Sequence, residues 1–273
     1  MQIRYLTAPI PPPTTPEVTS VTQVDAGAVS IAFAPSTSAV RSPVVHTAVA
    51  TPSASASAVS PVVTGSPLVL DGLPAGTPLT FRVVATDTSS VTATSGETAA
   101  LSLLHAPTLT SIVHDSSNVT LAFATLNPAD ADTVYVCEIG GALAFPGSNA
   151  SPVTTPVVEY GVPYVVMASN AAVGRARSAP VGPLMAVPTT NSADWVNENR
   201  VSLTIPFDAV PGAVMYACDV WTAVGTADVH VVATTCNVAP LVMRPLFGGS
   251  NYVGTLSAIR GIERAVANIA FRA

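Results

Sequence analysis

Three segments of this chain repeat one arrangement, in which apolar and polar side chains alternate directly after a turn. In the first copy, residues 70–87 read LDGLPAGTPLTFRVVATD, and apolar side chains occupy every second position from 79 to 85. Such alternation places one set of side chains on one face of a β-strand. Related alternations occur at 160–168 (YGVPYVVMA) and 248–258 (GGSNYVGTLSA). The anchoring residues are Leu79, Tyr164 and Tyr252. They lie 85 and 88 residues apart, which matches whole β-sandwich domains and is too long for a solenoid.

A second alternation, upstream of the first, also occurs three times. It reads GAVSIAFAP at 27–35, SNVTLAFAT at 117–125 and NRVSLTIPF at 199–207. The side chains predicted to face inward are Val29, Ile31, Phe33, Val119, Leu121, Phe123, Val201, Leu203 and Ile205. The chain has 25 prolines spread along its length, and Val and Thr dominate the alternating stretches. The predicted fold class is therefore all-β.

The corner before the first strand resembles the fibronectin type III family. In that family a Leu-x-Pro-Gly-Thr-x-Tyr corner precedes a core strand, and the Tyr hydroxyl bonds back to the backbone. The residues that carry the resemblance are LPAGTPL in the first copy, the anchors Tyr164 and Tyr252, and the aromatic residues Phe33 and Phe123. The sequence departs from the family where Leu79 replaces the Tyr, where Phe or Ile205 replaces the usual Trp, and where the later corners read VVEYG and RPLFGG. The resemblance implies tandem immunoglobulin-like sandwiches that serve adhesion, spacing or assembly.

The repeat predicts four parts of the chain. These are a Pro-rich N-terminal arm at 1–15 and three β-sandwich domains at 16–104, 105–187 and 188–273. LLHAPTL and LMAVPTT form the connections, each stiffened by a proline. The stretch TAPIPPPTTP at 7–16 predicts an extended polyproline-like segment, which is either a linker or a segment that docks on a neighbouring subunit.

Charge is scarce in this sequence. Charged residues make up 10% of the chain, against about a quarter in typical globular domains, and all ten basic residues are Arg. The net charge is −6 with no basic cluster, which excludes nucleic acid as the expected partner. No apolar run approaches the ~20 residues of a membrane span. The first residues lack the apolar core of a signal peptide, so either the chain is not secreted by that route or a signal was removed before this numbering begins. Met1 favours the first interpretation.

No residue pattern indicates catalysis, a cofactor or a metal site. The histidines are scattered without zinc-like spacing and are predicted to be surface or joint residues: His46, His105, His114 and His230. Asp130 and Asp132, in NPADADT, fit a turn better than a calcium site because too few further oxygen ligands lie nearby. Neither a Gly-x-Ser-x-Gly motif nor a Ser–His–Asp set is found, so an enzyme is not expected.

Three cysteines are too few for a disulfide framework. Cys218 and Cys236 lie close enough in the sequence to bridge neighbouring strands. The alternative is that the thiols are free and buried, packing as small apolar side chains. Cys137 favours this alternative, since it occupies the position equivalent to Cys218 in a repeat without a second cysteine.

The best candidates for a binding surface are arginines in the loops that follow the repeated strand. The loops at 169–180 and 259–266 hold four of the ten arginines, namely Arg175, Arg177, Arg260 and Arg264. Guanidinium groups form paired bonds to carboxylates, so these loops predict contact with an acidic protein or a glycan; charge that only keeps the loops soluble is the alternative. Trp221 is a further candidate, and Trp195 is the second tryptophan of the chain.

Together these features predict a non-enzymatic structural or interaction protein. The expected setting is the surface of a virion or similar large assembly, as a decoration, capsid or tail-associated component. Its partners would then be other structural proteins, or further copies of the chain, because few charges protect the sheet edges from pairing. The alternative is an extracellular or cell-surface adhesion protein that binds a glycan or a receptor.

Overall fold

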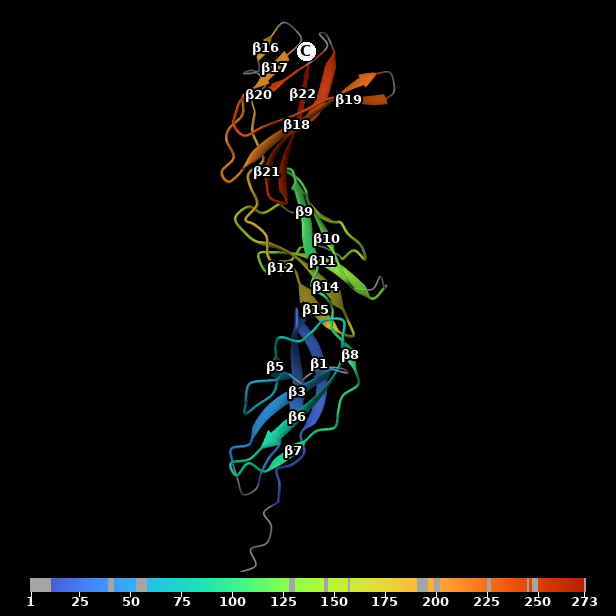
Figure 1. Cartoon of the computed structure of the whole chain (residues 1–273), viewed down its shortest axis with the longest axis vertical. Helices are drawn as coiled ribbons and strands as arrows, with labels where there is room; N and C mark the ends of the chain where they lie inside the picture. The colour runs from blue at the N-terminus through green and yellow to red at the C-terminus, as the bar shows by residue number, and fades with distance from the viewer. Residues whose placement is uncertain are drawn as a thin grey trace, which may run out of the picture. The chain divides into compact units, whose positions relative to one another are not determined.

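The computed structural model describes residues 11–38, 42–52, 58–127, 131–144, 147–156, 158–190, 196–198, 202–224, 227–244, 246 and 250–272 (Figure 1). None of these residues is helical, and strands follow one another along the chain, which confirms the all-β prediction. Within the described ranges, no helix has the length and apolar character needed to cross a membrane. Residues 1–10 of the predicted arm, Asp130, Trp195 and Val201 lie outside the described residues.

The first repeat forms two facing sheets. Its strands are β1 (Glu17–Asp25), β2 (Ala28–Ala34), β3 (Val45–Pro52), β4 (Ala58–Val59), β5 (Leu68–Leu70), β6 (Pro78–Thr86), β7 (Thr92–Thr94) and β8 (Leu101–Ser102). One sheet has the order β1-β2-β5 and the other β4-β3-β6-β7, with β8 also pairing β6. The predicted strand at 79–85 is β6, in the middle of the second sheet.

The second and third repeats have the same arrangement. The strands of the second are β9 (Thr108–His114), β10 (Val119–Ala124), β11 (Thr133–Ile139), β12 (Ala142–Leu143), β13 (Val153–Thr155), β14 (Tyr164–Asn170) and β15 (Gly174–Arg177). Those of the third are β16 (Val196–Glu198), β17 (Ser202–Ile205), β18 (Met215–Val224), β19 (Ala227–Cys236), β20 (Leu241–Met243), β21 (Asn251–Arg260) and β22 (Glu263–Arg272). The sheets are β9-β10-β13 with β12-β11-β14-β15, and β16-β17-β20 with β19-β18-β21-β22.

The alternating residues fill the interiors of the sandwiches. Every second side chain of β2, β6 and β10 is buried. The residues named from the sequence as anchors and core aromatics are all buried: Leu79, Tyr164, Tyr252, Phe33 and Phe123. Burial of a large apolar side chain contributes about 1.5–3 kcal/mol, so these strands supply most of the drive to fold.

Two local features recur between repeats. The strands β5, β13 and β20 begin 85 and 88 residues apart, the same period as the sequence anchors. In the first two repeats a serine two residues before this strand accepts a hydrogen bond from the strand that pairs with it. Phe33 N–H donates to Ser66 Oγ and Phe123 N–H donates to Ser151 Oγ, both at 2.9 Å. Tyr164 forms the predicted corner, because its hydroxyl accepts from Glu159 N–H at 2.8 Å and lies 3.1 Å from Glu159 O.

The chain forms two compact units whose limits do not follow the predicted domains. The first comprises 1–106, 125–133 and 168–177, and the second 107–124, 134–167 and 178–273. Loops of the second repeat, together with β15, therefore group with the first sandwich. The predicted boundaries at 104/105 and 187/188 remain predictions.

All three cysteines are free thiols; Cys137 and Cys218 are buried, as the buried-thiol interpretation expected, whereas Cys236 is half-buried. Cys218 is fully buried and contacts Met243, whereas Cys236 lies opposite Tyr216 in the β18–β19 pair, so the 218–236 disulfide is not formed. Burial raises the pKa of Cys137 and of Cys218 to about 12, assisted by the neighbouring charges of Glu138 and Asp219. Thiols with such pKa values stay protonated at neutral pH and are poor nucleophiles.

Candidate functional site

Two joints connect successive sandwiches, and they account for most of the predicted arginine sites. The first joint, within the first unit, is formed where the end of β1 meets the start of β15. The strands are parallel with Gln23 opposite Gly174, and Gln23 N–H donates to Val173 O at 2.8 Å. A Cβ at Gly174 would collide with the Gln23 backbone, and the φ of Gly174 is +126°. Only glycine allows this approach at such a φ without strain.

Neutral amides satisfy the backbone at the first joint. Gln23 is 1% exposed, and its Oε1 accepts from Leu104 N–H at 2.8 Å while its Nε2 donates to Leu104 O at 3.0 Å. Asn127 bonds both backbone groups of His105, the residue after Leu104. His105 N–H donates to Asn127 Oδ1 at 2.6 Å, and Asn127 Nδ2 donates to His105 O at 2.9 Å. The connection between the sandwiches is therefore bonded on both sides of its backbone by uncharged groups.

Arg175 and Arg177 also lie at the first joint. Arg175 Nε donates to Val24 O at 3.3 Å. The Arg177 N–H donates to Asp25 Oδ1 at 3.1 Å, and Arg177 Nη1 is 3.7 Å from Asp25 Oδ2. These side chains bind the neighbouring sandwich, which is a role that their position in the loop did not reveal.

The second joint, within the second unit, pairs β9 with β22. The strands are parallel, and Ile112 N–H donates to Ile262 O at 2.9 Å. Glu263, 2% exposed, takes the place that the amides have at the first joint, because Met185 N–H donates to its Oε1 at 2.5 Å. Arg260 Nε donates to Glu263 Oε2 at 3.1 Å, and Arg260 Nη2 reaches both this oxygen and Pro183 O.

A buried histidine completes the second joint. His114 is 1% exposed, and its Nε2 is 3.2 Å from Glu263 Oε1. Burial alone would raise the pKa of Glu263, but hydrogen bonds from His114, Met185 and Arg260, together with the Arg260 charge, lower it. Since an ionised carboxylate only accepts, Nε2 carries the proton and donates. Nδ1 is buried and has no hydrogen-bond partner within the described ranges.

A third cluster lies on the outer face of the sheet β19-β18-β21-β22, and we name it the Trp221 face. It consists of Asp219, Trp221, His230, Val253, Thr255, Ser257, Arg264 and Asn268. The strand registers bring it together, because Trp221 lies opposite both His230 and Val253, and Asp219 lies opposite Thr255. The alternate residues Cys218 and Val220 point into the core.

Asp219, Ser257 and Arg264 of the Trp221 face are bonded to one another. Arg264 Nη2 donates to Asp219 Oδ2 and Arg264 Nε donates to Ser257 Oγ, both at 2.9 Å. His230 Nε2 is 3.7 Å from Asp219 Oδ1, and the His230 ring is 5.4 Å from the Trp221 ring, centroid to centroid. The face is thus held in one arrangement before any partner arrives, which lowers the entropy cost of binding.

A shallow hollow of about 420 Å³ adjoins Trp221. Its lining combines apolar and polar residues: Trp221, Val253, Gly254, Thr255, Asn268, Ile269 and Ala270. Val253 is 54% exposed although it is apolar. An exposed apolar patch beside an aromatic ring and bonded charges is typical of a contact surface.

The structure separates the residues that the sequence singled out. Arg264 and Trp221 share the Trp221 face, Arg175 and Arg177 lie at the first joint, and Arg260 lies at the second. Among the histidines, His105 and His114 belong to the joints, as expected. The surface or joint prediction is wrong for His46, which is 1% exposed inside the first sandwich and accepts a hydrogen bond from Ser36 N–H.

Sequence reasoning missed several important residues. Gln23, Asn127 and Glu263 were not singled out, because an amide or a carboxylate in a strand or turn is ordinary in sequence. Asp219 and Trp221 do carry a signal, since they alternate with the buried Cys218 and Val220 and so share the outer face.

No family model matches the chain, and a search of curated proteins gives no match. Among solved structures, the crystal structure of chicken CNTN1 FN1-FN3 domains is similar, at 15% identity over 96% of this chain and 99% of that chain, with a TM-score of 0.26. A score this low carries no argument, so the assignment rests on the strands. Each repeat packs a three-stranded sheet on a four-stranded one, and the second has the tyrosine corner. The repeats are fibronectin type III-like sandwiches.

Proposed function

We propose that this chain is a non-enzymatic structural and interaction protein at the surface of a virion or similar large assembly, in a decoration, capsid or tail-associated position. The observation that carries the proposal is the Trp221 face. Trp and Arg are enriched among the residues that dominate binding energy at interfaces, and both are present here on one sheet face. The scarcity of charge in the rest of the chain fits a surface that packs against other structural proteins.

The polar cluster of the face supports a protein partner. Its Asp219–Arg264 pair is half-exposed and already neutralised within the chain. A partner that covers the pair does not bury an unpaired charge, so the desolvation cost of docking is reduced. The partner surface would be apolar opposite Trp221 and Val253, and polar opposite Thr255 and Asn268.

Co-sedimentation tests this proposal. Recombinant chain is added to particles from its native source that have been stripped of it, and bound chain is quantified after centrifugation. The wild type should bind in a fixed ratio, and Trp221→Ala should weaken binding by tenfold or more, since such residues contribute about 2 kcal/mol or more at interfaces. Val69→Ala removes an exposed apolar side chain from β5 in the first sandwich and should change nothing. Wild-type chain that never sediments with particles contradicts the proposal.

The hollow beside Trp221 favours a second candidate function, adhesion through a glycan. A sugar ring has apolar C–H faces and polar hydroxyls, which suit a Trp ring flanked by Thr255 and Asn268. Under this proposal the chain is extracellular or at the cell surface. A glycan array probed with the wild type and with Trp221→Ala tests this candidate function. A saccharide that binds the wild type but not the variant supports adhesion. An array with no bound saccharide contradicts it.

A further inference from the structure

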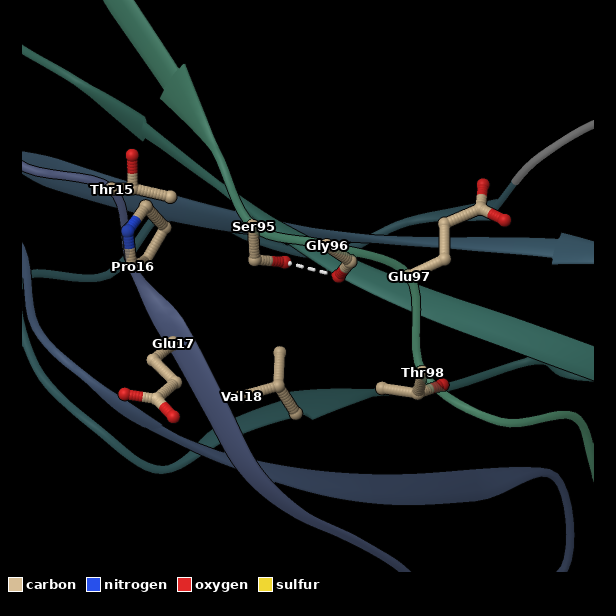
Figure 2. Close-up of a pocket in the computed structure, with 8 residues that line it drawn as sticks. All are labelled: Thr15, Pro16, Glu17, Val18, Ser95, Gly96, Glu97 and Thr98. Atoms are coloured by element: carbon tan, nitrogen blue, oxygen red, sulfur yellow. Dashed lines mark hydrogen bonds between the residues drawn. The ribbon is translucent and has the colours of Figure 1, made fainter.

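A groove runs along one edge of the first sandwich, away from the Trp221 face. Its walls come from opposite ends of the repeat: Thr15–Val21 on one side and Ser95–Leu101 on the other. Two hollows of about 460 and 360 Å³ make up the groove, and they share Val18 and Thr98. Figure 2 shows the first hollow, with Val18 between the walls and Glu17 and Glu97 at opposite margins.

Both walls have backbone edges without a strand partner among the described residues: β1 on one side, and on the other the irregular segment that joins β7 to β8. β1 pairs with β2 along one edge, and on its other edge the only register pair within the described ranges is Gln23 with Gly174. Within the described ranges, the backbone of segment 95–101 bonds to β6, through Ser95 N–H to Val83 O, Thr98 N–H to Phe81 O and the pairing of Leu101 with Leu79. Among the described residues, no backbone hydrogen bond joins the two walls. Such edges are templates for an added strand.

The chemistry of the groove selects an extended peptide with apolar residues and a positive charge. Val18 and Val21 supply apolar surface, and Ser95 and Thr98 are small enough to leave room above it. The charged residues of the lining are Glu17 and Glu97, both acidic and both exposed. Because the groove is acidic, it favours an occupant with a positive charge. The chain itself has ten basic residues, so a segment that carries one of these arginines would be complementary to the groove.

The N-terminal arm has the matching sequence. Residues 1–7 read MQIRYLT, in which Met1, Ile3 and Tyr5 alternate with Gln2, Arg4 and Leu6. This pattern predicts a β-strand in which Met1, Ile3 and Tyr5 form an apolar face and the opposite face carries Arg4 as its one charged side chain. Seven residues span about 23 Å as a strand, and each wall of the groove is also seven residues long.

The arm is fastened where it enters the sandwich, at one end of the groove. Thr14 N–H donates to Thr37 O at 3.0 Å, Thr37 N–H donates to Thr14 Oγ1 at 2.8 Å, and Pro13 and Pro16 are buried. Prolines at 9 and 11–13 precede this anchor. Consecutive prolines fix φ near −65° and favour an extended chain, so a tight reversal that returns residues 1–7 to their own groove is disfavoured.

We propose that residues 1–7 of one copy of the chain add as a β-strand to the groove between β1 and segment 95–101 of a second copy. This rests on the proposed function, since it names the partner for self-association within an assembly. Repetition of the exchange links copy to copy through a heterologous contact, which forms rings or open arrays. Arg4 lies in the middle of the added strand, within reach of the acidic margins.

A labelled peptide of residues 1–10 tests the inference, added to a chain that lacks those residues. Fluorescence anisotropy should show saturable binding. Gly96→Trp should weaken it by about tenfold or more, because a Cβ at Gly96 meets open space and the added ring fills the groove without straining the fold. Gly65→Trp is the matched control: Gly65 also has open space around it, lies in the same sandwich away from the groove, and should leave binding unchanged.

A charge exchange tests the orientation of the peptide. Glu97→Arg should weaken binding by about two- to fivefold, the scale of an exposed ion pair, and a peptide with Arg4→Glu should restore it. Failure of the peptide to bind, or equal binding by the two tryptophan variants, overturns the proposal. Sedimentation of the full chain decides the partner: association that grows with concentration and is lost in the shortened chain supports exchange, whereas a monomer at every concentration overturns it.

These measurements use purified chain alone. They can therefore fail while the chain still sediments with particles, and they can succeed while it does not. The failure of the arm exchange and the failure of the proposed function are thus distinguishable.

Discussion

The two joints solve the same problem with different chemistry. In each, the backbone N–H of the residue that leaves a sandwich, Leu104 or Met185, is buried and needs an acceptor. The first joint supplies the neutral amide of Gln23 from the same sandwich. The second supplies the carboxylate of Glu263 from the next sandwich; Arg260 balances its charge and His114 donates a hydrogen bond to it.

A buried connection between sandwiches can therefore be built either from neutral groups, which do not respond to pH, or from charged groups, which do. A neutral amide donates and accepts without titrating, so the buried backbone connection at Leu104 has no charge to lose; the Asp25–Arg177 pair lies beside it. The second joint depends on a buried ion cluster, whose parts are costly to leave unpaired. Four measurements test whether the two joints differ in this way.

The largest effect is expected for Glu263→Ala. It leaves Met185 N–H without its acceptor and Arg260 and His114 without their carboxylate, and we expect a loss of about 3 kcal/mol, at the low end for a broken buried pair because Arg260 is 37% exposed. Hydrogen exchange of the Met185 and Ile112 amides should accelerate about a hundredfold, while Gln23 keeps its protection. Glu263→Gln, which keeps an acceptor for Met185, should lose less. Equal protection in all variants contradicts the assigned role of Glu263.

Acidification should open the second joint alone. The pKa of Glu263 is lowered in the folded chain, so its contribution is complete above the ordinary value of 4.5 and is lost as pH falls through the lowered folded value. The effect is smaller than that of Glu263→Ala, since the protonated carboxyl still fills its place. Amide exchange at Ile112 and Gln23, corrected for intrinsic pH dependence, should diverge below this pH. In Glu263→Gln the exchange rates of the two amides should no longer diverge. If the rates at Ile112 and Gln23 change in parallel in the wild type, the second joint is not pH-sensitive.

Gly174→Ala should damage only the first joint. Its Cβ meets the Gln23 backbone and its φ is positive, so we expect a cost of about 2 kcal/mol and loss of the β1–β15 pairing. The control is Gly261→Ala near the second joint, where φ is +57° but a Cβ meets open space; it should cost about 1 kcal/mol. Exchange at the Gln23 amide reports the difference, and equal effects of the two variants would show that the contact with Gln23 is unimportant.

The smallest effect is expected for Asp25→Asn. Asp25 and Arg177 form a 3.7 Å ion pair that is only partly buried, and Asn retains an oxygen for the Arg177 N–H. The change in stability should stay below about 0.5 kcal/mol, with little dependence on salt. Chemical denaturation of both proteins at low and high ionic strength checks this. A loss of several times that size would mean that the first joint also depends on charge.

The interaction surfaces show where sequence reasoning succeeds in part. Trp221 could be placed on an outer face because Cys218 and Val220, its alternating neighbours, had to point inward. The pairing of Trp221 with His230 and the bond from Arg264 to Asp219 were not readable, since they depend on strand register and on a bulge between Val220 and Trp221. The groove at Glu17 and Glu97 was likewise invisible, because its walls are some 80 residues apart.

From the sequence alone, the all-β class of fold, the repeated strands and the buried side chains of those strands could be predicted. Alternation decides which side chains are buried, and burial of residues such as Phe81 and Leu121 is a local consequence of that period. Only the tertiary structure decided what the arginines do. Arg175 and Arg177 follow the same kind of strand as Arg260 and Arg264, yet one pair meets β1, one residue meets Glu263 and one lies on an open sheet face. The physical reason is that a guanidinium bonds whichever acceptor lies within reach, and those acceptors, Val24 and Asp25 above all, come from residues about 150 positions away.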